Sequence, residues 1–232
     1  MPKKDILFFL ALLLFFLPFF VSNDIYRFYI EFNSEHGMIM AFVKFAILAT
    51  LGEVIGLRIR KRVYYENGFG VLPRALVWGF LGLTIKMAFV IFAVGTPAFL
   101  AYLGIDKAPQ IMQENISWAK VGVAFSISLT MNLIFAPIMM TMHKITDTHI
   151  IQNNGSLIGF LKPIKLRYIF VNLNWDLMWN FVFKKTIPFF WIPAHTITFL
   201  LPTDFQVLFA AILGIALGVI LAVAELFNEK NT

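Results

Sequence analysis

The sequence predicts an all-α integral membrane protein, a polytopic bundle of about six transmembrane helices with both termini on the cytoplasmic side. Hydrophobic residues make up 59% of the 232 residues, against about 45–50% in an average soluble domain. Charged residues make up only 14% and separate long apolar segments. Such a chain could not cover its apolar surface with polar groups in water, and it is too hydrophobic to be disordered. Both soluble classes are therefore excluded.

A transmembrane helix needs about 20 predominantly apolar residues. Six segments meet or approach this length, at residues 6–21, 38–57, 75–103, 117–142, 181–201 and 205–227. The third exceeds a simple crossing, so we expect it to tilt or to bend near Pro97. No change of composition indicates a separate soluble domain, so residues 1–232 are interpreted as one transmembrane domain.

The first apolar segment has two interpretations. Lys3 and Lys4 precede a short apolar run, a pattern shared by secretory signal peptides and by first transmembrane helices. Val21, Ser22 and Asn23 make a poor cleavage site, which favours a retained helix. A cleaved signal peptide is the alternative.

The connection between the fourth and fifth segments is long. Residues 143–156 are polar, and we expect them to form a loop. Residues 157–174 are mixed and basic, with Tyr168 inside them and Trp175 and Trp179 close behind. This composition predicts a segment that lies along the membrane surface.

Basic residues are unequally divided between the two sides of the predicted bundle. If six helices cross, fourteen Lys and Arg residues fall on one side and three on the other, while Lys44 and Lys86 lie inside spans. The larger set is Lys3, Lys4, Arg58, Arg60, Lys61, Arg62, Arg74, Lys144, Lys162, Lys165, Arg167, Lys184, Lys185 and Lys230. The smaller set is Arg27, Lys107 and Lys120. Because cytoplasmic loops carry an excess of Lys and Arg, this distribution predicts cytoplasmic termini.

The same features predict the location and the partners. Short tails, a plain charge bias and no recognisable import signal fit a bacterial cytoplasmic membrane, with an organelle inner membrane as the alternative. The net charge of +6 comes from basic residues at the ends of apolar segments, so the expected partner is the lipid bilayer and not nucleic acid.

No pattern in the sequence indicates an enzyme. There is no cysteine, which excludes thiolate chemistry and disulfides. No H-E-x-x-H, G-x-S-x-G or P-loop pattern occurs. We therefore expect no catalytic residue and no cofactor.

Small residues form seams on two predicted helices. The second helix contains Gly52 and Gly56, four residues apart. The sixth carries a longer series on one face, at Ala210, Gly214, Gly218 and Ala222. Small residues let helix backbones approach closely in a membrane. The seams predict either packing within the bundle or contact with a second copy or another membrane subunit.

Ionisable residues lie well inside the second and third predicted spans. An ionised side chain near the bilayer centre costs at least about 2.5–3.5 kcal/mol unless it is paired or hydrated. Lys86 is near the middle of its helix, whereas Lys44 and Glu53 are nine residues apart, on opposite faces of theirs. We therefore expect Glu53 or a polar group such as Asn132 to pair with Lys86 across the bundle.

A hydrated cavity is the alternative to this structural pairing. Lys44, Lys86 and His195 would line such a cavity, next to Pro188 and Pro193 of the fifth helix. Together the intramembrane polar residues favour a small-solute channel or transport-related protein, whose solute the sequence does not identify. They are Lys44, Glu53, Lys86, Asn132 and His195. A structural or assembly protein is the alternative, indicated by the glycine seams.

One short pattern has the spacing of metal ligands. His143, Asp147 and His149 follow the fourth helix as H-x3-D-x-H. No further strong ligand lies close by in the sequence, so we predict no metal site.

Four blocks of residues resemble, in order, the family of mitochondrial inner-membrane and peroxisomal proteins named for the Mpv-seventeen protein and the twenty-two-kilodalton peroxisomal membrane protein. The blocks are Gly52-Glu53, then Pro73 with Trp78, then residues 131–137 ending in Phe-Ala-Pro, and last Trp191, Pro193, His195, Thr198, Phe199 and Pro202. The chain has Met131 and Asn132 where the family has Asp-Gln, and His195 and Thr198 where it has Gln and Asn. The resemblance implies a small helical membrane protein with a channel-like or solute-homeostasis role and no defined catalytic residues.

Overall fold

The computed structural model describes residues 3–229, with side chains described for residues 3–220, 222 and 223. Lys230, one of the fourteen cations of the larger set, lies outside the described residues. Every regular element in the described part of the chain is a helix. The chain divides into two compact units, residues 1–40 and residues 41–232.

The first unit contains three helices, α1 (Lys3–Phe16), α2 (Pro18–Val21) and α3 (Asn23–Glu35). Together α1 and α2 form an apolar stretch long enough to cross a membrane, in the place of the predicted first span. Ser22 ends α2 and caps α3, because its side chain accepts a hydrogen bond from the backbone N–H of Ile25 at 3.4 Å. Helix α3 lies between the first two predicted spans and was not predicted from the apolar pattern.

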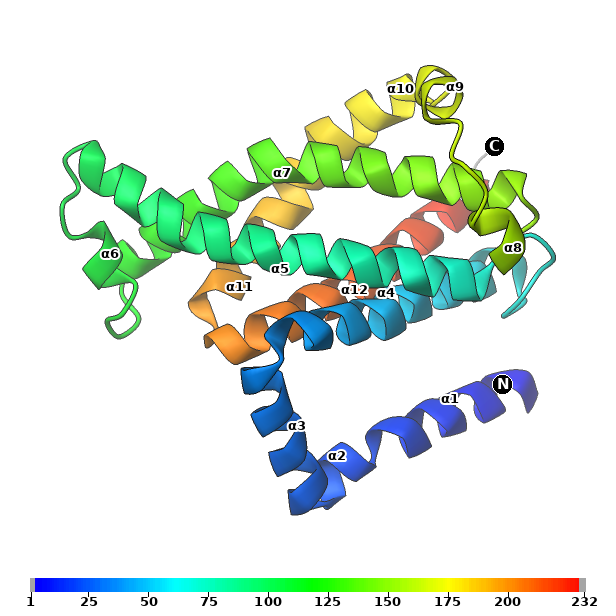
Figure 1. Ribbon diagram of the computed structural model, residues 1–232, viewed down its shortest axis with the longest axis horizontal. Coiled ribbons are helices and arrows are strands. Elements are labelled where there is room, and N and C mark those ends of the chain that lie inside the picture. Colours follow the sequence, from blue (N-terminus) through cyan, green and yellow to red (C-terminus); the bar gives the residue numbers. More distant parts are fainter. Residues whose placement is uncertain (1–2, 230–232) are drawn as a thin grey trace. The chain divides into compact units, whose positions relative to one another are not determined.

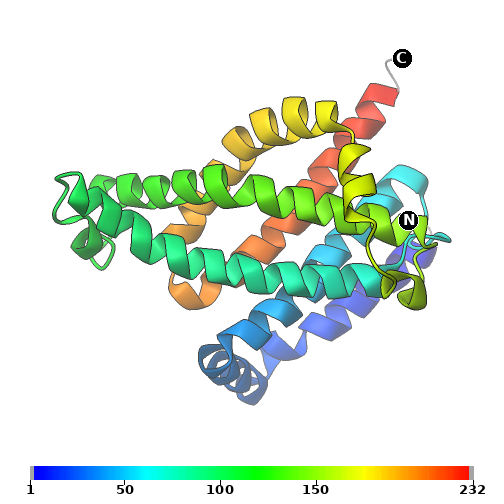
Figure 2. The ribbon, with the colours of Figure 1, turned by 45° about the horizontal axis from the view of Figure 1, so that its top comes forward.

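The second unit is built around long helices that agree with four predicted spans. They are α4 (Gly37–Lys61), most of which belongs to this unit, α5 (Val71–Tyr102), α7 (Trp118–Gln152) and α12 (Thr203–Glu229). Each contains a stretch long and apolar enough to cross a membrane, which brings the number of such helices in the described residues to five. In Figures 1 and 2, α5 and α7 run side by side, joined at one end through the short α6 (Ala108–Ile111).

The predicted polar loop at residues 143–156 is wrong, because α7 continues to Gln152. The hydroxyl of Thr146 donates to the carbonyl of His143 at 2.8 Å, and the hydroxyl of Thr148 donates to that of Lys144 at 2.8 Å. These polar side chains therefore find acceptors inside the helix. The helix ends where Asn154 and Gly155 adopt positive φ angles of 55° and 63°.

The predicted fifth span falls on two consecutive helices, the π-helical η1 (Met178–Trp191) and α11 (Ile192–Leu200). Pro188 and Pro193 lie within them and supply no N–H to the regular α-helical ladder. Ahead of them come three short helices, α8 (Leu157–Phe160), α9 (Leu166–Val171) and α10 (Trp175–Leu177). The first two occupy the segment that we expect along the membrane surface.

The two glycine seams pack against each other. A Cβ atom placed on Gly52 would lie 2.8 Å from the Cα of Ile215, and one placed on Gly218 would lie 3.2 Å from the carbonyl oxygen of Gly52. A Cβ on Gly56 would lie 3.6 Å from the carbonyl oxygen of Gly218. The backbones of α4 and α12 are thus in direct contact, as small residues permit.

Because the atom facing Gly52 belongs to the backbone, Gly52→Ala should force α4 and α12 apart. We expect a loss of roughly 1–3 kcal/mol, the usual cost of overpacking, seen as a lower midpoint of thermal unfolding in detergent. Gly122→Ala is the matched control, since its Cβ would meet nothing within 4 Å. Equal midpoints for the two variants would contradict the close contact.

Candidate functional site

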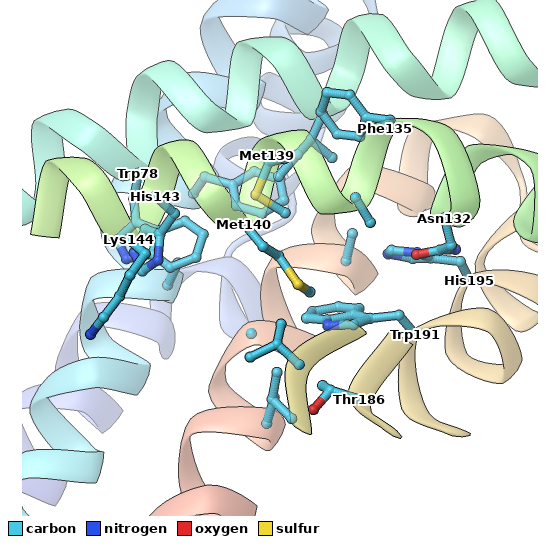
Figure 3. A pocket seen from close by; sticks show the side chains of 18 of the residues that line it. Trp78, Asn132, Phe135, Met139, Met140, His143, Lys144, Thr186, Trp191 and His195 are labelled. Carbon is cyan, nitrogen blue, oxygen red and sulfur yellow. The ribbon is translucent and has the colours of Figure 1, made fainter. Parts of the chain in front are cut away.

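An apolar cavity of about 290 Å³ lies inside the second unit. Its walls come from α4, α5, α7, η1, α11 and α12. Methionine and aromatic side chains make up much of the lining, and Figure 3 shows Met139 and Met140 between two polar ends. Trp78, His143 and Lys144 gather at one end, and Asn132 and His195 lie at the other.

The first polar end is held by a buried ion-pair cluster, consisting of Glu53, Arg74, His143 and Asp147. The guanidinium of Arg74 contacts the carboxylates of both Glu53 and Asp147. The Nε2 atom of His143 lies 3.3 Å from Oε1 of Glu53. The side chains of Arg74, Asp147 and Glu53 are only 9%, 13% and 19% exposed. One cation therefore joins carboxylates from α4 and α7 to the beginning of α5.

Further contacts fix the geometry of this ion-pair cluster. The indole of Trp78 donates from Nε1 to Oε1 of Glu53 at 2.8 Å, and its ring lies 4.4 Å from that of His143. Arg74 donates from Nε to the carbonyl of Phe69 at 2.6 Å and lies over the ring of Phe69. The oxygens of Glu53 are thus shared among a cation, an indole and an imidazole, which compensates for removing the carboxylate from water.

Glycines bring the start of α5 to the end of α7. A Cβ on Gly155 would lie 2.5 Å from the backbone nitrogen of Gly70, so a larger residue at position 155 would collide with the turn that precedes α5. Gly70 itself has a φ of 69°, which favours glycine. This close approach places Arg74, one turn into α5, beside Asp147 of α7.

Neutral polar groups form the opposite end of the cavity. The amide nitrogen of Asn132 lies 3.1 Å from Nδ1 of His195 and donates to the carbonyl of Ser128 at 2.8 Å. The hydroxyl of Ser128 donates to the carbonyl of Ile192 at 2.7 Å and so joins α7 to α11. The ring of His195 stacks on Trp191 with 5.1 Å between centroids. This end offers hydrogen-bonding atoms without a carboxylate or a permanent cation.

Of the five predicted intramembrane polar residues, three line the cavity: Glu53, Asn132 and His195. Lys44 and Lys86 are not among the described residues that line it.

The expected pairing of Lys86 with Glu53 or Asn132 is wrong. Glu53 pairs with Arg74, and Asn132 pairs with His195. Arg74 precedes the predicted third span, at a position expected in a connecting loop. The structure places it in the first turns of α5 with only 8% of its surface exposed.

Two residues of the H-x3-D-x-H pattern, His143 and Asp147, belong to the ion-pair cluster. His143 and Asp147 are four residues apart on α7 and both face the α4–α5 side, where Glu53 and Arg74 lie. His149 points elsewhere, with its Nε2 atom 3.1 Å from the carbonyl oxygen of Phe160. No group of three or more potential ligands that could hold a metal ion occurs among the described side chains, residues 3–220, 222 and 223. The four-residue spacing was the sequence signal that could have identified the ion-pair cluster.

No protein-family model, curated protein or solved structure matches the chain. The resemblance to the Mpv-seventeen family therefore stays a prediction. Chemically, the arrangement is that of a binding cavity, because apolar walls enclose space between two hydrogen-bonding ends.

Removing the central cation should unfold this end of the bundle. Arg74→Gln removes the cation that Glu53 and Asp147 share and leaves Asp147 only the 3.4 Å contact with Lys144. Breaking a buried pair typically costs about 3–5 kcal/mol. We expect a much lower unfolding midpoint in detergent, partly restored when Glu53→Gln is added.

The control for Arg74→Gln is Lys61→Gln, which breaks the exposed 2.8 Å pair between Lys61 and Glu66. Exposed pairs contribute about 0–1 kcal/mol, so the midpoint should barely move. If Arg74→Gln were as stable as Lys61→Gln, the central role of the buried cation would be refuted.

Proposed function

We propose that the protein is a multi-pass membrane protein that binds a small solute in the cavity and has a channel or transport-related role. The observation that carries the proposal is the cavity itself, enclosed by apolar helices and polar at both ends. Its volume of about 290 Å³ is near the lower end of the range for ligand pockets, about 300–1,000 Å³.

The lining defines the chemical class of the proposed solute. Methionine side chains such as Met139 and Met140 adapt to ligands of irregular shape, and Glu53 is already neutralised by Arg74. A strongly charged solute would have no free counter-ion along most of the cavity. The best fit is a small, largely apolar molecule with a hydrogen-bonding group at one end or both.

The indole of Trp191 supplies a further contact for this solute. Its Nε1 atom is buried and has no hydrogen-bond partner among the described residues, and its side chain lines the cavity. A buried donor without an acceptor costs about 1–3 kcal/mol. A solute that carries an acceptor would recover this free energy on binding.

The proposed topology has six crossings, with both termini on the cytoplasmic side of a bacterial membrane. Five helices in the described part of the chain are long and apolar enough to cross. We propose that η1 with α11 supplies the sixth as one uninterrupted stretch, Met178 to Leu200. The unequal division of Lys and Arg supports this arrangement. An organelle inner membrane is the alternative location.

An assembly role has less support than a solute role. The glycine seams that favoured a partner subunit pack against each other within the chain. They therefore leave no free face for another helix at Gly52 and Gly218. The resemblance to the Mpv-seventeen family, if correct, agrees with the solute role.

Cysteine accessibility tests the cavity on this cysteine-free background. In liposomes, Met140→Cys, which lies in the cavity lining, should react with a small polar thiol reagent, because a solute pathway admits water. Leu133→Cys is the control, since Leu133 is 60% exposed on the outside of α7 and should face lipid. Equal protection at both positions would refute a hydrated cavity.

Leakage from liposomes tests transport directly. Liposomes that contain the protein should release small neutral solutes faster than large ones, and Met140→Trp should slow the release by filling the cavity. Leu133→Trp should leave the rate unchanged. Release that is independent of solute size, or insensitive to Met140→Trp, would contradict the channel role.

Reporter fusions test the topology. A reporter joined to either terminus should be active on the cytoplasmic side only, because an even number of crossings returns the chain to the side where it began. Activity on opposite sides would mean an odd number of crossings, as when η1 and α11 do not cross.

A further inference from the structure

A second hollow lies on the outside of the second unit, between α7 and the helices α9, α10 and η1. This α7–α9 groove, of about 600 Å³, is lined on the α7 side by residues from Pro137 to Ile145. Its other wall consists of Leu166, Arg167, Phe170, Trp175 and Phe183. Arg167 is the only charged residue of this lining, so the groove combines a long apolar floor with one cation.

The walls of the α7–α9 groove are fixed by packing. Ile145 of α7 is buried against Ile169 of α9 and against Leu173, which follows α9. The indole of Trp175 donates from Nε1 to the carbonyl of Phe170 at 2.9 Å, which holds the turn after α9. The groove is therefore a built feature of the fold.

Two exposed lysines closely precede Arg167 in the sequence. They are Lys162 and Lys165, and the side chain of Arg167 is also exposed. None of the three forms an ion pair with a carboxylate of the described residues. This differs from the basic residues at the end of α4, where Lys61 pairs with Glu66.

Shape and charge together select the occupant. The floor extends over nine residues of α7, whose eight steps of 1.5 Å span roughly 12 Å. It exposes large apolar side chains such as Ile138, 63% exposed. An acyl chain suits such a floor, whereas an acidic peptide would have to bury polar backbone against it. The unpaired cations suit a phosphate group.

We infer that the α7–α9 groove binds an anionic phospholipid, with an acyl chain along α7 and the phosphate on Arg167, Lys165 and Lys162. This site is separate from the solute cavity and rests only on the proposed membrane location. The lipid would fasten the segment that carries α9 to the membrane surface.

The test measures which lipid the intact chain retains. The protein is reconstituted into vesicles of equal parts phosphatidylcholine and phosphatidylglycerol and extracted in mild detergent, and the bound lipids are counted by mass spectrometry. The unmodified chain should retain phosphatidylglycerol in preference to phosphatidylcholine. A triple variant, Lys162→Gln with Lys165→Gln and Arg167→Gln, should lose this preference by at least about fivefold, the effect of a single basic residue near a membrane surface.

Two further variants separate a specific site from general attraction. Arg60→Gln with Lys61→Gln and Arg62→Gln removes the same charge elsewhere and should keep the preference. Ile138→Trp fills the floor while keeping all cations, and it should lose the preference.

An equal loss in both triple variants, or no loss in Ile138→Trp, would overturn the lipid site. A dimer that Ile138→Trp converts to a monomer would overturn it too, since the groove would then hold a second copy. Flotation of every variant with the vesicles reports the membrane location independently, so a failure of that proposal would be recognised separately.

Discussion

The arrangement of the second unit depends on Arg74, a buried cation placed between two carboxylates. Glu53 and Asp147 come from different helices, and neither could stay ionised away from water without a partner. Arg74 supplies that partner to both at once and anchors itself on the carbonyl of Phe69. Three helices are thereby fixed at one end, and the end of the cavity between them is defined.

This constraint explains why the two ends of the cavity differ. At the end held by Arg74, the polar atoms are already committed to one another, with Trp78 and His143 completing the contacts of Glu53. At the other end, Asn132 and His195 contact each other and Trp191 retains an unused donor. The first end of the cavity is thus held in place by its own contacts, and the second end keeps groups that a bound solute could contact.

The sequence predicted the helices well because hydropathy and segment length depend on local composition. Four predicted spans coincide with α4, α5, α7 and α12 to within a few residues at most ends. The error at the end of α7 has a physical cause: His143 and Asp147 resemble solvated loop residues when their partners are unknown. Only the folded chain shows that Glu53 and Arg74 take the place of water.

The candidate site was harder to predict for the same reason. Glu53, Asn132 and His195 stood out as polar residues in apolar segments, and all three line the cavity. Their partners could not be inferred, because pairing depends on how helices are turned toward one another. Arg74 was not recognised because it lies next to a loop in the sequence. Glu53, one of the partners predicted for Lys86, pairs with Arg74 instead.

The π-helical stretch η1 forms one wall of the cavity with a hydrogen-bond spacing that differs from that of the other walls. The opposite wall is stiff, because α4 and α12 touch backbone to backbone, and α11 is tied to α7 through Ser128. In η1 each hydrogen bond spans five residues instead of four, so the helix holds spare length. If η1 adopted α-helical hydrogen bonding, the side chains of Met178 and Thr186, which both line the cavity, would point in other directions. The width of the cavity would then change without a change in the other helices.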